Sequence, residues 1–94
     1  MPYVDPVSRK KLDMGLLPEN PGELNYSITT LIMDYLENTD RRYGDYNAVI
    51  GVLECAKQEL YRREISPYED KKKMENGDVY SRLLDTVGSD NRTA

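Results

Sequence analysis

Apolar residues recur with the period of an α-helix in the first half of the chain. Between residues 24 and 36 they follow one another at spacings of four, three, one, three and one, which places them on one helical stripe. The stripe consists of Leu24, Ile28, Leu31, Ile32, Tyr35 and Leu36. Before it, Asn20-Pro21-Gly22-Glu23 supplies an N-cap side chain, a proline at the first helical position and a carboxylate at the third. This pattern predicts a helix that ends near Asn38.

A second apolar pattern occupies residues 45–60, with Asp45 as the predicted N-cap. Its main stripe has a three-four-three-four spacing and consists of Tyr46, Val49, Leu53, Ala56 and Leu60. Ile50 and Val52 widen the apolar surface beyond one stripe, so we expect this helix to contact the first helix on one side and another subunit on the other. The polar residues 39–44 predict the loop that joins two antiparallel helices.

The same periodicity predicts which residues pack in the core. Tyr35, Tyr46 and Tyr61 fall at core spacing, and Cys55 beside the stripe is expected to be a buried small hydrophobe. Gly51, four residues before Cys55, would let a neighbouring backbone approach closely.

A shorter helix is expected after Pro67. Ser66-Pro67-Tyr68-Glu69 repeats the capping pattern, which predicts a new helix start or a sharp bend, and Asn76-Gly77 predicts the end. Residues 78–84 are expected to form one more short helix. The fold class is therefore all-α, with an irregular N-terminal arm over residues 1–21, a helical domain over 22–84 and a flexible tail over 85–94. Within the arm, which holds four of the five prolines, we expect a short helix capped by Ser8 and ended by Gly15.

Composition then narrows the function. The chain has 94 residues, no His, no Trp, no Phe, one Cys and eight Tyr, so no imidazole base and no His-containing zinc site is available. We therefore expect no catalytic residues, no metal and no cofactor, and a protein that is not an enzyme. The net charge of −4 argues against binding to long nucleic acid or to an anionic membrane. Without a long apolar run or a signal-peptide pattern at the N-terminus, we expect a cytoplasmic protein.

The chain has few residues of the types that form hydrophobic cores. Leu, Ile and Val together make up 20 of 94 residues. A domain of this size is marginally stable by itself, and a partner subunit can supply the missing apolar contacts. We therefore expect a homo-oligomer.

Tyrosines and basic residues near predicted helix starts are the candidates for ligand binding. A tyrosine can stack on a base and bond to a phosphate, and the first turn of a helix presents free N–H groups to anions. The candidate ligand-binding residues are Asn25, Tyr26, Arg62, Arg63, Tyr68 and Lys72. The alternative interpretation of the charged residues is a solvated helix face held by pairs four residues apart, such as Glu54 with Gln58 and Glu59 with Arg63.

Three segments carry a resemblance to a known family. The stretches GELNYSITTL (22–31), NAVIGVLECAKQELYRR (47–63) and PYEDKKKMENGDVY (67–80), together with the opening MPYVDPVSRKKLD, resemble a small family of phage and bacterial proteins catalogued as a domain of unknown function. In size and lack of catalytic residues the chain is also similar to phage sponge proteins of the anti-CBASS class. In this sequence the link between the arm and GELNY is short and proline-rich, which leaves the placement of the arm open.

The resemblance to sponge proteins implies a phage immune-evasion function. The protein would bind a cyclic oligonucleotide such as cyclic GMP-AMP and sequester it without hydrolysis, as a homo-oligomer, with a tetramer favoured, in the host cytoplasm. The competing hypothesis is a helical protein–protein interaction module, an adaptor or inhibitor of a host protein, which would use the wide apolar surface of the second main helix.

Overall fold

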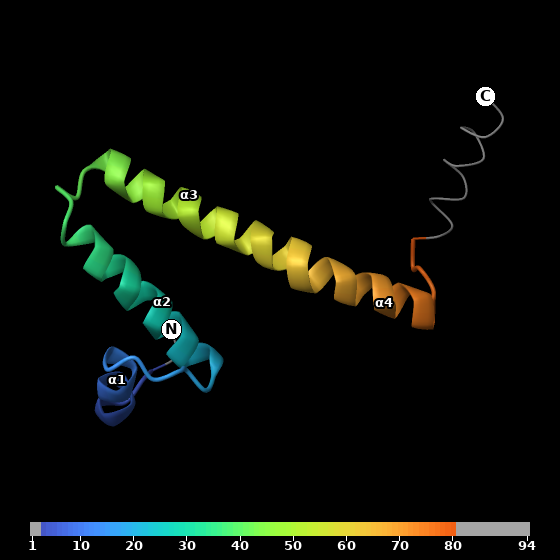
Figure 1. The fold of residues 1–94 in the computed structure, drawn as a ribbon, viewed down its shortest axis with the longest axis horizontal. Coiled ribbons are helices and arrows are strands. Elements are labelled where there is room, and N and C mark those ends of the chain that lie inside the picture. Colours follow the sequence, from blue (N-terminus) through green and yellow to red (C-terminus); the bar gives the residue numbers. More distant parts are fainter. Residues whose placement is uncertain (1–2, 81–94) are drawn as a thin grey trace. The chain divides into compact units, whose positions relative to one another are not determined.

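The structure, a computed structural model, describes residues 3–80. The order of elements in this part of the chain is α1 (Pro6–Asp13), α2 (Pro21–Leu36), α3 (Tyr43–Leu60), the π-helical segment η1 (Tyr61–Ile65) and α4 (Ser66–Asn76) (Figure 1). No strand occurs among the described residues, so the predicted all-α fold is confirmed. The chain divides into two compact units, Met1–Val52 and Leu53–Ala94.

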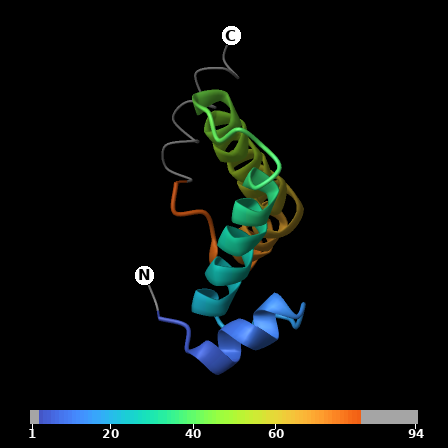
Figure 2. The ribbon, with the colours of Figure 1, turned by 90° about the vertical axis from the view of Figure 1, so that its left-hand side faces the viewer.

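The N-terminal arm contains the expected short helix. Pro6 stands at the start of α1, and an Oδ atom of Asp5 accepts a hydrogen bond from the Ser8 N–H at 2.9 Å. The cap is therefore Asp5, and the prediction of Ser8 as the cap was wrong because a carboxylate three residues earlier occupies that position. Gly15, with φ of +94°, follows the helix as predicted. Figures 1 and 2 show α1 beside the N-terminal half of α2, which it contacts.

The start of α2 has the predicted capping arrangement. The Asn20 side chain accepts a hydrogen bond from the Glu23 N–H at 2.9 Å. The Glu23 carboxylate accepts one from the Glu19 N–H at 3.1 Å and one from the Asn20 side-chain amide at 3.3 Å. The helix ends at Leu36, whose carbonyl oxygen accepts a hydrogen bond from the Thr39 hydroxyl at 2.7 Å. Local hydrogen bonds thus fix both ends of α2.

The loop between α2 and α3 is held by short-range polar contacts. An ion pair at 2.6 Å joins Glu37 to Arg41, a residue with a positive φ of 54°. Asp45 accepts a hydrogen bond from the Arg42 N–H at 3.1 Å. Because α3 already begins at Tyr43, Asp45 lies in its first turn, and the prediction of Asp45 as the N-cap was wrong.

The core of the first unit is very small. Among residues 3–80, the buried hydrophobic side chains are Leu36 at 8% exposure and Val49 at 9%. Tyr35 and Tyr46, predicted to pack in the core, are exposed. No atom lies within 4 Å of a Cβ built on Gly51, so the predicted close approach of another backbone does not occur within the described chain. The apolar stripes form as predicted, but most of their surface stays uncovered.

The second unit is a helical run that continues through Pro67. Leu60, Ile65 and Ser66 all have right-handed helical dihedrals, and the Ser66 N–H donates to the Tyr61 carbonyl oxygen, five residues back. α4 begins at Ser66 as predicted, but it continues from η1 without a break and so has no N-cap outside the helix. A proline ring clashes with the carbonyl four residues before it, and the wider π-turn relieves that clash without ending the helix.

The end of α4 was predicted correctly. Gly77 has a φ of +86°, and its N–H donates to the Lys73 carbonyl oxygen at 2.8 Å. Cys55 and Tyr61, predicted to pack, are exposed in this unit. The predicted helix over 78–84 and the tail over 85–94 lie largely or wholly outside the described residues.

Candidate functional site

Asn25 and Tyr26 lie together on α2, next to α1. Both line an open groove of about 520 Å³ whose wall also includes Tyr3 and Arg9. The Tyr26 hydroxyl donates a hydrogen bond to an Oδ atom of Asp13 at 3.0 Å. Desolvation and this hydrogen bond to a carboxylate both raise the pKa of Tyr26. The hydroxyl of Tyr26 therefore links α1 to α2, while its ring remains part of the groove.

The N-terminus of α2 already holds an acidic group. The carboxylate of Glu23, in the first turn, accepts hydrogen bonds from the Glu19 N–H and the Asn20 amide. A carboxylate at this position interacts favourably with the helix dipole, as a bound phosphate would. This helix start is thus satisfied by its own side chains.

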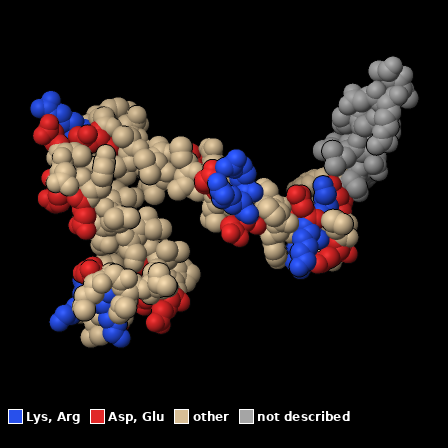
Figure 3. Space-filling model, viewed as in Figure 1, with Lys and Arg blue, Asp and Glu red and all other residues tan. Residues whose placement is uncertain are grey.

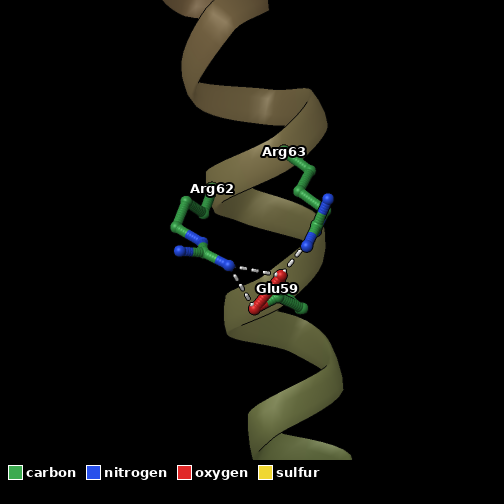
Figure 4. Close-up of polar contacts among 3 residues, drawn as sticks. All are labelled: Glu59, Arg62 and Arg63. Atoms are coloured by element: carbon green, nitrogen blue, oxygen red, sulfur yellow. Dashed lines mark hydrogen bonds and ion pairs between the residues drawn. The ribbon is translucent and has the colours of Figure 1, made fainter.

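Arg62 and Arg63 converge on a single carboxylate. Arg62 donates from one guanidinium nitrogen to both Glu59 oxygens at 2.8 Å, and Arg63 donates from Nε at 2.6 Å (Figure 4). The hydrogen bonds from Arg62 and then from Arg63 lower the pKa of Glu59. The predicted pair of Glu59 with Arg63 is confirmed, and so is that of Glu54 with Gln58, at 3.4 Å. With Glu64 in the same segment, residues 59–64 carry two acidic and two basic side chains and no net charge.

Tyr68 and Lys72 come together one turn apart on α4. The Lys72 ammonium lies 5.7 Å from the centre of the Tyr68 ring, a cation–π distance, and also 3.4 Å from a Glu75 oxygen. Both residues line an open groove of about 620 Å³ that also includes Lys73 and Tyr80. The groove therefore offers two tyrosines and two lysines, together with the carboxylates of Glu69, Asp70 and Asp78.

The start of α4 is not an anion-binding helix N-terminus. Ile65 precedes it in a helical conformation without a side-chain cap, and the Ser66 N–H is bonded to Tyr61. Free N–H groups at Ser66-Pro67-Tyr68 were predicted from an isolated helix start, whereas α4 continues directly from η1. Any ligand bound near Tyr68 would depend on side chains alone.

A further groove lies between α2 and α3 within the first unit. Its volume is about 270 Å³, and every side chain that lines it is apolar or a tyrosine. We call it the apolar face, and it consists of Leu31, Ile32, Tyr35, Ala48, Val49 and Val52. Leu31, Ile32, Tyr35 and Val49 belong to the predicted stripes, and Val52 was predicted to widen the apolar surface toward another subunit. In the structure Leu31 is 70% exposed and Val52 is 65% exposed.

The six predicted ligand-binding residues thus fall into three groups. Asn25 and Tyr26 share one groove in the first unit, Tyr68 and Lys72 share another in the second, and the two arginines pair with Glu59. Sequence reasoning missed three further residues that line these grooves, Arg9, Lys73 and Tyr80. Lys73 belongs to the lysine run 71–73 and Tyr80 is one of the eight tyrosines, whereas nothing in the sequence pointed to Arg9.

Nowhere in residues 3–80 do three or more Cys, Asp or Glu side chains form a cluster able to hold a metal ion. In the same range, no helix has both the length and the apolar character needed to cross a bilayer.

Comparison with known proteins gives one match. Residues 1–79 match the family described as "Domain of unknown function (DUF6899)". Neither a curated protein nor a solved structure matches the chain. The matched range covers most of the 94 residues and includes all five helical elements found within residues 3–80. The chain therefore belongs to the DUF6899 family of uncharacterised domains.

Proposed function

We propose that this protein is a helical protein–protein interaction module that works through the apolar face between α2 and α3. The observation that carries the proposal is the contrast between a core of Leu36 and Val49 and a face on which Leu31 and Val52 are about two-thirds exposed. Contiguous exposed apolar surface between helices is typical of a surface that binds another protein.

The charge distribution supports an apolar partner surface. Residues 24–33 of α2 and residues 46–53, in α3, contain no charged side chain. On the side seen in Figure 3, the first half of α3 shows almost no charged surface. A surface without charge gains affinity from desolvation and shape, so its partner should present apolar side chains, as an amphipathic helix does.

Affinity capture with matched variants tests this function. Leu31→Glu places a charge on the apolar face, and Met74→Glu places the same charge at an 87% exposed apolar residue on α4. We expect a stoichiometric protein to be retained by the wild type and by Met74→Glu, and lost with Leu31→Glu, because burying an unpaired carboxylate in an interface is costly. Equal retention by both variants would contradict the assignment of the face.

A second candidate is the sequestration of a cyclic oligonucleotide, which one specific observation favours. The groove on α4 combines the rings of Tyr68 and Tyr80 with the ammonium groups of Lys72 and Lys73, which pair with Glu75 and Asp78, and its lining also includes Glu69 and Asp70. Aromatic rings stack on bases without sequence preference and lysines bind phosphates, so the groove suits a small nucleotide that is held and not hydrolysed. Together with the resemblance to phage sponge proteins, the composition of this groove supports a function in immune evasion. The protein would act in the host cytoplasm as a homo-oligomer, such as a tetramer.

Titration calorimetry with a panel of cyclic di- and trinucleotides, including cyclic GMP-AMP, tests the sponge function. We expect a dissociation constant below about 10 μM, which corresponds to roughly −7 kcal/mol. Tyr68→Ala and Lys72→Ala should each weaken binding, whereas Lys10→Ala on α1 serves as the control. If no ligand in the panel binds the wild type, this second candidate fails.

A further inference from the structure

We infer that the partner seated on the apolar face is a second copy of this chain, bound through a symmetric contact that α2 and the adjoining part of α3 form with themselves. The inference rests on the proposed function, because it names the occupant of the same face. Three observations carry it: the pattern of the α2 stripe, its lack of charge and the area it leaves exposed.

The α2 stripe has the pattern that two like helices use to pack together. Leu24, Ile28, Leu31 and Tyr35 are spaced four, three and four residues apart, so they stand on one side of α2. Rows of side chains at these spacings interdigitate with the same rows on a second helix. The stripe is therefore complementary to a copy of itself, and the chain's own α1 and α3 leave it exposed.

The charges allow this self-contact. The uncharged residues 24–33 lie between Glu23 and Asp34, and the Glu23 carboxylate is engaged in capping α2. Two copies meeting along the stripe therefore bring no like charges together within it. Because the stripe has no charged group, it cannot select a partner by charge complementarity.

The exposed side chains of this surface supply about three-quarters of the apolar area of a standard interface. A fully exposed aliphatic side chain offers roughly 100 Å² and a tyrosine roughly 200 Å². Leu24, Ile28, Leu31, Tyr35 and Val52 are 50%, 41%, 70%, 59% and 65% exposed. Together they offer on the order of 350 Å² per copy, against roughly 450 Å² of apolar area in a standard interface of about 800 Å² per partner.

Because its core is small, the chain needs a permanent partner to cover its apolar surface. A second copy of the same chain is present wherever the first copy is. In the first unit, Leu36 and Val49 are the described hydrophobic residues that are buried within one chain. Small domains of this kind commonly gain the missing burial by association with themselves.

Sedimentation equilibrium over a range of protein concentrations tests the inference. We expect the wild type to be a dimer or a larger even-numbered assembly at about 10 μM, and Leu31→Glu to raise its dissociation constant about 100-fold. Met74→Glu, the matched control, should leave the assembly unchanged. A wild type that is monomeric at roughly 200 μM would overturn the inference, and so would equal weakening by the two variants.

Cysteine cross-linking tests the same contact without placing a charge on the face. In a Cys55→Ser background, Ile28→Cys and Leu31→Cys stand at the middle of the stripe and should form covalent dimers with a short bis-maleimide. Met74→Cys should not. If Leu31→Cys links only to a different protein and the wild type sediments as a monomer, the inference falls while the proposed interaction function stands. If the chain self-associates and no other protein is captured, the inference stands and the module acts between copies.

Discussion

Replacement of Leu36 by alanine tests the packing of the first unit directly. Leu36 is 8% exposed, so nearly all of its side chain is removed from water. Leu→Ala deletes three carbons, each worth about 0.8 kcal/mol when buried, and any cavity that remains adds to the loss. Most of the surrounding side chains are exposed and can move into the space that Leu36 leaves. We therefore expect a loss of unfolding free energy at the low end of the range usual for Leu→Ala, about 2 to 3 kcal/mol. A chain of 94 residues has a total stability of roughly 5–14 kcal/mol, so the loss is a large fraction.

Urea denaturation followed by far-ultraviolet circular dichroism measures this loss. With a slope near 1 kcal/mol per molar urea, the midpoint should fall by about 2 M. Met74→Ala is the control, because Met74 is 87% exposed and should shift the midpoint very little. All variants are compared at one protein concentration, since association changes apparent stability. Equal shifts for the two variants would refute the conclusion that Leu36 is a core residue.

Three further predictions concern local structure. Asn20→Ala removes the cap of α2 and should lower stability by about 1 kcal/mol in urea denaturation, whereas Asn20→Asp, which keeps the acceptor, should not. Pro67→Ala removes the cause of the π-turn, so we expect backbone chemical shifts to show regular α-helix over residues 61–65. Thermal unfolding should show a gain in stability of about 1–3 kcal/mol. A loss of stability would contradict this account. The Glu59 pKa lies below its ordinary value of 4.5, so the stability that its ion pairs add is present above pH 4.5 and lost as the pH falls through the lowered pKa. Glu59→Gln cannot form these ion pairs, so its helicity should fall less than that of the wild type as the pH is lowered through the Glu59 pKa. If helicity depends on pH in the same way in both proteins, the ion pairs do not contribute to stability.

Features decided by neighbouring residues could be predicted from the sequence. The capping arrangement of Asn20 and Glu23 and the stop at Gly77 need only residues within one helical turn. The ion pair of Glu59 with Arg63 follows from helical spacing. For the same reason, the all-α class and the apolar stripe of α2 were correct, since both depend on periodicity.

Features decided over longer distances could not be predicted in this way. Pro67 looked like a helix start because proline is common there, but the helix already running through residues 53–60 makes a widened turn possible. The hydrogen bond from Tyr26 to Asp13 joins residues 13 positions apart and depends on how α1 lies against α2. The grouping of Tyr68 and Lys72 with Tyr80 likewise depends on the turn after Gly77.

By itself, the sequence determined which side chains share a helical face, because that follows from a fixed period of 3.6 residues. Only the tertiary structure decided which of those faces are covered. Periodicity placed Leu31 and Tyr35 on the same stripe as Leu36, whereas the arrangement of α2 and α3 buries Leu36 and Val49 and leaves Leu31 and Tyr35 exposed. An apolar stripe has the same pattern whether its own chain or another one covers it, so only the placement of the helices could reveal the surface that we propose as the functional one.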